Sequence, residues 1–227
     1  MLLAIDTATQ VMSLALHDGD SVRAEVTWRT ANNHTAELAP AVRDLLARSG
    51  AALGDLRALA VSIGPGSYTG LRIGVALAKG LAAARGLPLV GVSSLDTLAA
   101  AQPYVQGSGL VVVVEAGRGR VIAATYRWRR GRWDNRGEPE TLDWDTLIAS
   151  IDGPAALTGD ISAAAQARLA EAQARGVPIT INAPVYRLRR AGFLAEEALA
   201  RLRAGGDYSA ARLTPLYVKT RDLPGNA

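Results

Sequence analysis

Apolar and polar positions alternate with two periods along the chain, and these periods predict both strands and helices. Near the start, three β-rich runs are separated by turn residues and cover 2–7, 12–16 and 22–28. Because the second and third runs are joined by only a short turn at 17–20, we expect three antiparallel strands. Apolar residues at helical spacing then predict a helix near 38–48, where Pro40 either lies in the first turn or kinks a helix that begins near His34.

The order of predicted elements in the first half of the chain is repeated in the second half. The first half continues with a strand, a helix, a strand and a short helix, at 59–63, 69–85, 87–92 and 94–101. The second half shows three strand-like runs, the third weaker, at 110–115, 121–128 and 132–142. A helix, a strand, a helix, a strand and a closing helix follow at 143–150, 155–158, 161–175, 177–181 and 187–203. Both halves therefore have the same predicted order.

This repeated order predicts the fold class. Strands linked by helices need helices packed on their sheet, so each half is expected to be an α/β unit. The order is that of the actin, hexokinase and heat-shock ATPase (ASKHA) fold, in which two similar lobes each hold a mixed sheet. We place the lobes at residues 1–103 and 104–227, with the last segment as a candidate to return to the first lobe.

The amino-acid composition excludes several kinds of functional site. The 227 residues are 49% hydrophobic and 20% charged, which is typical of a folded globular chain, and they include no cysteine and two histidines. Disulfides and thiolate sites are thereby excluded, and His17 and His34 cannot build a zinc site alone. We expect His17 to be exposed and His34 to lie at the entrance of the first helix. Because Asp6 interrupts the first apolar run and no run is long enough to span a membrane, we expect a cytoplasmic protein.

The net charge of +4 suggests a polyanionic partner, but 23 of the 25 basic residues are arginine, which genomic base composition explains equally well. Seven of these arginines lie between Arg118 and Arg136, with Asp134 as the one acid and with Trp128 and Trp133 among them. This segment is interpreted first as the solvated rim of a hairpin. Direct contact with RNA is the alternative, since guanidinium and indole groups bind phosphates and bases.

A glycine-rich segment at 64–74 is the most informative motif. It follows a predicted strand and precedes a predicted helix, where free amide groups can bind an anion or a side-chain oxygen. The segment lacks the ending of a P-loop, the spacing of a dinucleotide motif and the pattern of a nucleophile elbow. We therefore expect a structural loop in which Ser67 caps the helix. Its predicted members are Gly64, Pro65, Gly66, Ser67, Thr69 and Gly70.

The helix after this loop has more apolar surface than one core requires. Arg72 and Lys79 lie on its one charged stripe. It also has two apolar faces, one with Ile73, Leu77 and Leu81 and the other with Leu71, Val75 and Ala82. Between these faces lie three small residues spaced four apart, Gly70, Gly74 and Ala78. Part of this surface is expected to meet a second helix, either of the same lobe or of another chain.

These motifs together resemble the bacterial TsaB (YeaZ) family, which is involved in making threonylcarbamoyladenosine on tRNA beside the anticodon. The resemblance covers nearly the whole chain, and the 64–74 loop is its most specific part. The other matching segments are 3–9, 33–35, 92–95, 115–119 and 214–218. In the 115–119 segment Glu115 and Gly117 replace the aspartate and the first arginine of the family's Asp-Ala-Arg-Arg-Gly turn.

The resemblance implies a subunit without catalysis, cofactor or metal of its own, which supports the transferase TsaD together with the ATPase TsaE. The complex would use ATP through those two partners, and the same surface would form a homodimer in their absence. The metal-binding histidine pair of TsaD-like proteins is replaced by Ser94 and Leu98, which cannot ligate a transition metal. The expected partner-binding residues are Leu38, Val42, Leu45, Leu71, Arg72, Gly74, Val75, Ala78, Lys79 and Ala82.

A second class of function stays open, an ATP-dependent small-molecule kinase of the ASKHA superfamily. Asp6 and Glu115 each end the first strand of a half, where such kinases carry carboxylates toward the nucleotide. With Thr7 and Gly159 they define a vestigial nucleotide cleft, although the acid Asp160 after Gly159 should hinder close approach of a ligand. The alternative for either acid is a strand-end carboxylate that accepts hydrogen bonds from turn amides.

Overall fold

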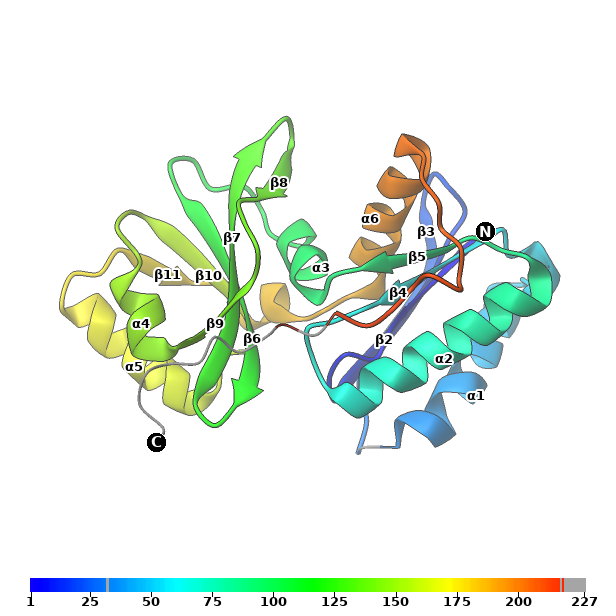
Figure 1. The fold of residues 1–227 in the computed structure, drawn as a ribbon, viewed down its shortest axis with the longest axis horizontal. Coiled ribbons are helices and arrows are strands. Elements are labelled where there is room, and N and C mark those ends of the chain that lie inside the picture. The colour runs from blue at the N-terminus through cyan, green and yellow to red at the C-terminus, as the bar shows by residue number, and fades with distance from the viewer. Residues whose placement is uncertain (32, 217, 219–227) are drawn as a thin grey trace. The chain divides into compact units, whose positions relative to one another are not determined.

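The computed structural model describes residues 1–31, 33–216 and 218, so Tyr217 of the terminal motif lies outside the described residues. The chain forms two compact units (Figure 1). Unit 1 contains Met1–Ala101 and Arg189–Leu216, and unit 2 contains Gln102–Leu188. Within the described residues, none of the helices combines the length and the apolar character needed to cross a membrane.

Unit 1 is built on a five-stranded mixed sheet with the order β3-β2-β1-β4-β5. Its strands are β1 (Leu2–Asp6), β2 (Val11–His17), β3 (Val22–Arg29), β4 (Ala58–Ser62) and β5 (Leu89–Val92). The first three strands are antiparallel, as predicted, and β4 and β5 run parallel to β1. Because side chains alternate along a strand, the apolar residues of β1 serve two separate cores.

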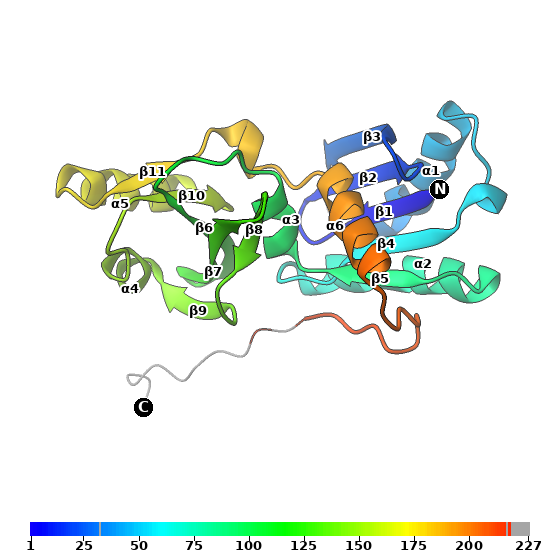
Figure 2. The ribbon, with the colours of Figure 1, turned by 90° about the horizontal axis from the view of Figure 1, so that it is seen from above.

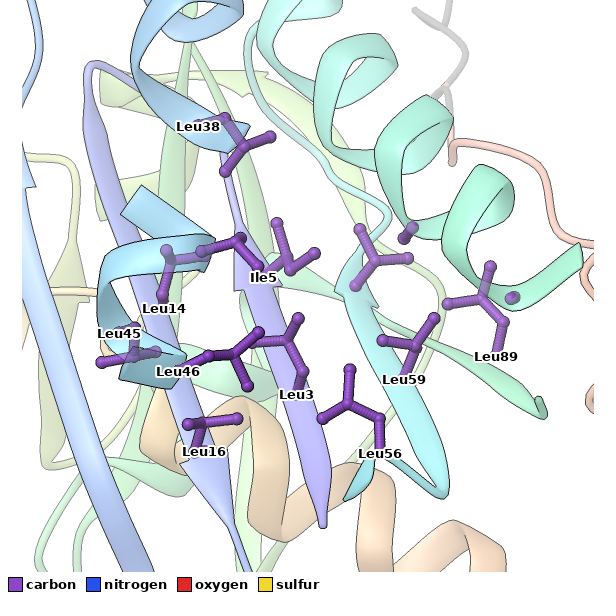
Figure 3. Close-up of a cluster of buried hydrophobic side chains, with 14 of the residues drawn as sticks. Leu3, Ile5, Leu14, Leu16, Leu38, Leu45, Leu46, Leu56, Leu59 and Leu89 are labelled. Atoms are coloured by element: carbon purple, nitrogen blue, oxygen red, sulfur yellow. The ribbon is translucent and has the colours of Figure 1, made fainter. Parts of the chain in front are cut away.

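Two helices cover one face of this sheet, α1 (His34–Arg48) and α2 (Tyr68–Arg85). Leu3 and Ile5 of β1 point to this face, and Figure 3 shows Leu38, Leu45 and Leu46 of α1 pointing toward the same cluster. Pro40 lies inside α1, which begins at His34 rather than later. A 3-10 turn, η1 (Leu53–Asp55), connects α1 to β4, and α3 (Ser94–Ala100) follows β5.

The opposite face of the sheet is covered by α6 (Ala191–Ala204), which corrects the predicted lobe boundary. The repeat predicts this closing helix in the second lobe, 104–227, with return of the last segment to the first lobe left open. That return is observed, since Leu194, Ala195 and Ala198 pack in one buried cluster with Leu2 and Ala4 of β1. Figure 2 shows α6 lying across β1 and β2. The apolar face that β1, β4 and β5 leave open needs a cover, and the last helix supplies it.

Unit 2 holds a second mixed sheet with the order β11-β10-β6-β7-β8. Its strands are β6 (Gly109–Gly117), β7 (Arg120–Arg129), β8 (Arg132–Asn135), β9 (Glu140–Asp143), β10 (Ala155–Gly159) and β11 (Ile179–Ile181). The weak third run predicted at 132–142 is two strands, β8 and β9, which pair with successive parts of β7. Pro139 lies in the interruption, where its missing N–H cannot join the ladder.

The helices of unit 2 are α4 (Trp144–Ala149) and α5 (Ala163–Ala174), with a 3-10 turn, η2 (Pro184–Arg187), before the chain returns to unit 1. Trp144, Leu147 and Leu169 from the two helices form a buried cluster with Val111 and Val113 of β6. Asp143 caps α4 by accepting a hydrogen bond from the Thr146 N–H at 2.7 Å. This hydrogen bond holds the pKa of the Asp143 carboxyl below its ordinary value of 3.8.

Candidate functional site

The glycine loop of unit 1 is held against the chain that follows β1. The Ser67 N–H donates to the Ala8 carbonyl oxygen at 2.7 Å. A Cβ on Gly66 would lie 2.3 Å from the same oxygen, so only glycine allows this approach. Ser67 then caps α2 by accepting a hydrogen bond from the Gly70 N–H at 3.3 Å. This loop is therefore bound to its own lobe.

The first two turns of α2 continue this close contact. A Cβ on Gly70 would lie 2.2 Å from the Thr7 carbonyl oxygen, and one on Gly74 would lie 2.2 Å from Thr7 Oγ1. The Thr7 hydroxyl donates to the Gly70 carbonyl at 2.8 Å. The small residues of α2 therefore serve an approach between the helix and the end of β1 in the same unit. Thr69 is exposed at the start of the helix.

This packing corrects most of the predicted partner-binding set. Eight of the ten residues are buried in the interior of unit 1: Leu38, Val42, Leu45, Leu71, Gly74, Val75, Ala78 and Ala82. Six of them belong to the main apolar cluster of the unit, so they pack inside the unit, although Val42 also lines a groove between α1 and α2. Of the predicted set, Arg72 is exposed and Lys79 is half-buried.

The surface that α1 and α2 present is an apolar groove. We call it the α1–α2 groove, and its volume is about 400 Å³. It is lined by Ala39, Val42, Arg43, Leu46, Ala47, Ala51, Ala52, Leu53, Leu77 and Leu81. Leu53 of η1 is 46% exposed, whereas Leu77 and Leu81 are half-buried. Thus the second apolar face of α2, not the one predicted, carries the open surface.

The entrance of α1 is fixed by hydrogen bonds. Glu37 accepts from Trp28 Nε1 at 2.7 Å and from the Thr30 hydroxyl at 2.9 Å. These two donors, that of Trp28 first, hold the pKa of the Glu37 carboxyl below its ordinary value of 4.5. His34 is buried, and its Nε2 lies 2.8 Å from the Thr9 carbonyl oxygen, so this ring joins α1 to the β1–β2 turn.

His17 departs from the expected exposure. It is buried at the end of β2, where Nδ1 accepts from the Gly19 N–H at 3.0 Å and Nε2 lies 2.9 Å from a Glu196 carboxylate oxygen of α6. The prediction was wrong because α6 covers this strand, and the turn pattern alone does not reveal that cover. Both histidines thus have contacts that hold segments of unit 1 together.

The residues of the predicted cleft have contacts within their own units. Asp6 is buried and its Oδ1 accepts from the Ala8 N–H at 2.9 Å. In unit 2, Glu115 is exposed and accepts from the Ser162 N–H at 3.0 Å, at the start of α5. A Cβ on Gly159 would lie 1.9 Å from the Val113 carbonyl oxygen, so glycine is required for pairing of β10 with β6. Both acids thus accept hydrogen bonds from backbone amides, which is the alternative weighed from the sequence.

The two positions that correspond to the metal-binding histidines of TsaD-like proteins are buried in this chain. Ser94 and Leu98 are both fully buried, and Ser94 Oγ lies 2.9 Å from Ser62 Oγ on β4. No group of three histidine, cysteine, aspartate or glutamate side chains suited to a metal ion occurs in the part of the chain that the structure describes. A buried hydroxyl pair and an aliphatic side chain give this position a packing role.

Comparison with known proteins places the chain in a family. The family model described as "TsaD: tRNA N6-adenosine threonylcarbamoyltransferase" matches residues 26–184. The "tRNA threonylcarbamoyladenosine biosynthesis protein TsaB" of Bacillus subtilis is 37% identical over 161 residues, or 70% of each chain. The Escherichia coli protein of the same name is 42% identical over 134 residues, or 58% of each chain.

Solved structures agree with this assignment. The structure described as "YeaZ from Pseudomonas aeruginosa" superposes with a TM-score of 0.77 at 26% identity, covering 96% of this chain and 99% of that one. Component A of (R)-2-hydroxyglutaryl-CoA dehydratase from Acidaminococcus fermentans, at 12% identity and a TM-score of 0.50, shares the fold alone. The predicted duplicated ASKHA-like α/β fold is confirmed, and the chain belongs to the TsaB (YeaZ) family.

Proposed function

We propose that this chain is a non-catalytic subunit of the bacterial complex that forms threonylcarbamoyladenosine next to the anticodon of tRNA. In this role it binds a TsaD-type transferase and supports it together with a TsaE-type ATPase. Relatives named for threonylcarbamoyladenosine biosynthesis support the pathway. The closed Ser62–Ser94 pair supports the absence of metal chemistry in this subunit.

The observation that carries the proposal is the α1–α2 groove. Its lining is mainly aliphatic, and a hydrophobic groove is the kind of surface that an amphipathic helix recognises. A helical partner laying an apolar face across Leu77 and Leu81 would remove them from water. Arg43 of α1 is the charged residue in the lining of this groove. In the absence of the transferase, a second copy of this chain would use the same surface, since a two-fold contact can reuse one patch.

The experiment that tests this proposal is co-purification of the chain with its TsaD-type partner after Leu77→Arg substitution. A guanidinium in the groove would be desolvated without a counter-charge, so we expect at least a tenfold loss of affinity. Ala167→Arg on α5 is the matched control, because Ala167 is exposed on a helix of unit 2. Undiminished binding by Leu77→Arg, with both variants folded by circular dichroism, would contradict the proposal.

The kinase alternative is tested separately by calorimetry with MgATP. The proposed subunit has no cofactor of its own, and ATP is used by the complex through the TsaD-type and TsaE-type partners. We expect no heat of binding from the isolated chain. Micromolar affinity together with turnover, both lost in Asp6→Asn, would instead support a kinase.

A further inference from the structure

The hairpin formed by β7 and β8 extends beyond the rest of the unit 2 sheet. The pairing of β6 with β7 ends at Leu110 and Tyr126, so residues 127–129 pair with β8 alone. Arg130 and Gly131 form the turn, both with positive φ, at 50° and 81°. We call residues 127–135 the hairpin tip, and Figure 1 shows it projecting from the sheet. A two-stranded projection contributes little to a core.

One face of the hairpin tip concentrates positive charge. Arg129 and Arg132 are direct cross-strand partners, and Arg127 lies two residues along the same face. Like charges at such positions are destabilising. Asp134 pairs with Arg132 at 3.0 Å, whereas no carboxylate among the described residues forms an ion pair with Arg127, Arg129 or Arg130, all of which are exposed. The stability of unit 2 does not account for this arrangement, but an anionic ligand would.

The other face of the hairpin tip holds a partly exposed aromatic stack. Trp128 stacks on Tyr104, with ring centroids 5.1 Å apart and an interplanar angle of 23°. Trp133 is buried beneath them, 5.3 Å from Trp128 in an edge arrangement, and its Nε1 donates to the Gln102 carbonyl at 3.1 Å. Trp128 and Tyr104 remain 36% and 48% exposed. Buried Trp133 thus supports the stack, while part of Trp128 and Tyr104 stays accessible to solvent.

We propose that the hairpin tip binds single-stranded RNA. Arg127, Arg129 and Arg130 contact consecutive phosphates, and an unpaired base extends the Tyr104–Trp128 stack. Aromatic platforms and guanidinium groups are the usual means of holding unpaired nucleotides without base-specific readout. Here they lie on the two faces of a two-stranded tip, so the RNA strand would pass around the turn at Arg130 to reach both. The inference rests on the proposed function for the identity of its RNA, because that function supplies a tRNA with an unpaired anticodon loop. The exposed arginines on a hairpin match the first interpretation of this segment as a solvated rim, and the proposal adds a ligand for that surface.

The test is fluorescence anisotropy with the full chain and a labelled, unmodified tRNA anticodon stem-loop. Arg127→Ala/Arg129→Ala should weaken binding at least tenfold and reduce the salt slope of log K by about two. The matched control is Arg168→Ala/Arg175→Ala, on α5 and at its C-cap, which removes the same formal charge from unit 2 and should change affinity less than threefold. Trp128→Ala should lose about tenfold, whereas Trp128→Tyr, which keeps an aromatic face, should stay within threefold.

Several outcomes would overturn the inference. These are no measurable RNA binding by the parent chain, equal losses in the hairpin and α5 variants, and no difference between Trp128→Ala and Trp128→Tyr. Loss of binding to an acidic protein partner with RNA affinity unchanged would assign the surface to protein instead. Co-purification with the TsaD-type partner is measured on the same variants. If the parent chain co-purifies with the partner but does not bind RNA, this inference fails and the proposed function stands. If the parent chain binds RNA but does not co-purify with the partner, the proposed function fails.

Discussion

The two apolar faces of α2 have similar composition and different surroundings. One face, with Leu71, Val75 and Ala82, is buried against the sheet, and the other, with Leu77 and Leu81, lines an open groove. The small residues Gly70, Gly74 and Ala78 lie on the buried side, because there the helix meets the backbone after β1. A small-residue stripe on this helix therefore marks intramolecular contact, and Leu77 and Leu81 line the groove for which we propose a partner.

The largest expected effect comes from placing one charge on either face. Val75→Arg would bury an unpaired guanidinium in the sheet-facing core, at a cost above about 4 kcal/mol, a large part of the stability of a typical domain. We expect the chain to be insoluble or unfolded by circular dichroism. Leu77→Arg should retain a cooperative thermal transition. Similar unfolding by both variants would show that the two faces are equally buried.

Gly70→Ala probes the close approach on the buried face. The added methyl group would lie 2.2 Å from the Thr7 carbonyl oxygen, so helix and strand must separate. We expect a loss of about 1–3 kcal/mol in the free energy of unfolding, measured by urea denaturation. An unchanged midpoint would mean that α2 is not pressed against the end of β1.

Ser67→Ala removes the side-chain cap at the start of α2. Loss of the acceptor for the Gly70 N–H should destabilise unit 1 by about 1 kcal/mol. Ser67→Asp, which keeps an acceptor at the cap, is the matched variant and should recover most of the loss. Equal midpoints for the alanine and aspartate variants would argue against the cap.

The smallest effect is expected on the exposed side of α2, and with the opposite sign. Gly80 is exposed and a Cβ there would meet nothing within 4 Å. Gly80→Ala should therefore raise stability by about 0.5–1 kcal/mol, because alanine has the higher helix propensity and restricts the unfolded chain. Destabilisation would reveal a close neighbour at this position.

Periodicity predicted the element order well because most strands and helices of this chain are bounded by strong turn signals. Predicted strands and helices in both units match the observed ones within a few residues, as for the helix at 69–85, observed as α2. Period alone could not decide which apolar face of α2 meets the sheet, since both satisfy the same spacing. A usable signal was present in Gly70 and Gly74, whose missing side chains indicate the side of closest backbone approach.

The sequence left the placement of α6 undecided for a different reason. A repeat in element order gives each half its own closing helix, but packing depends on which sheet face remains uncovered, and that is set by long-range contacts. The same contacts bury His17. The stacking of Trp128 on Tyr104 was equally hidden, because Tyr104 lies in a segment with no strand pattern, before β6.

The discontinuity of unit 1 has a consequence for how the protein is made. Residues 1–101, which hold all strands of the unit 1 sheet, are translated before α6. This helix, which covers one face of that sheet, begins nearly ninety residues later. Until α6 leaves the exit tunnel, Leu2 and Ala4 have no cover, and the nascent first unit is open to chaperones and to aggregation. A premature stop codon anywhere before α6 would therefore leave one face of the unit 1 sheet without its covering helix.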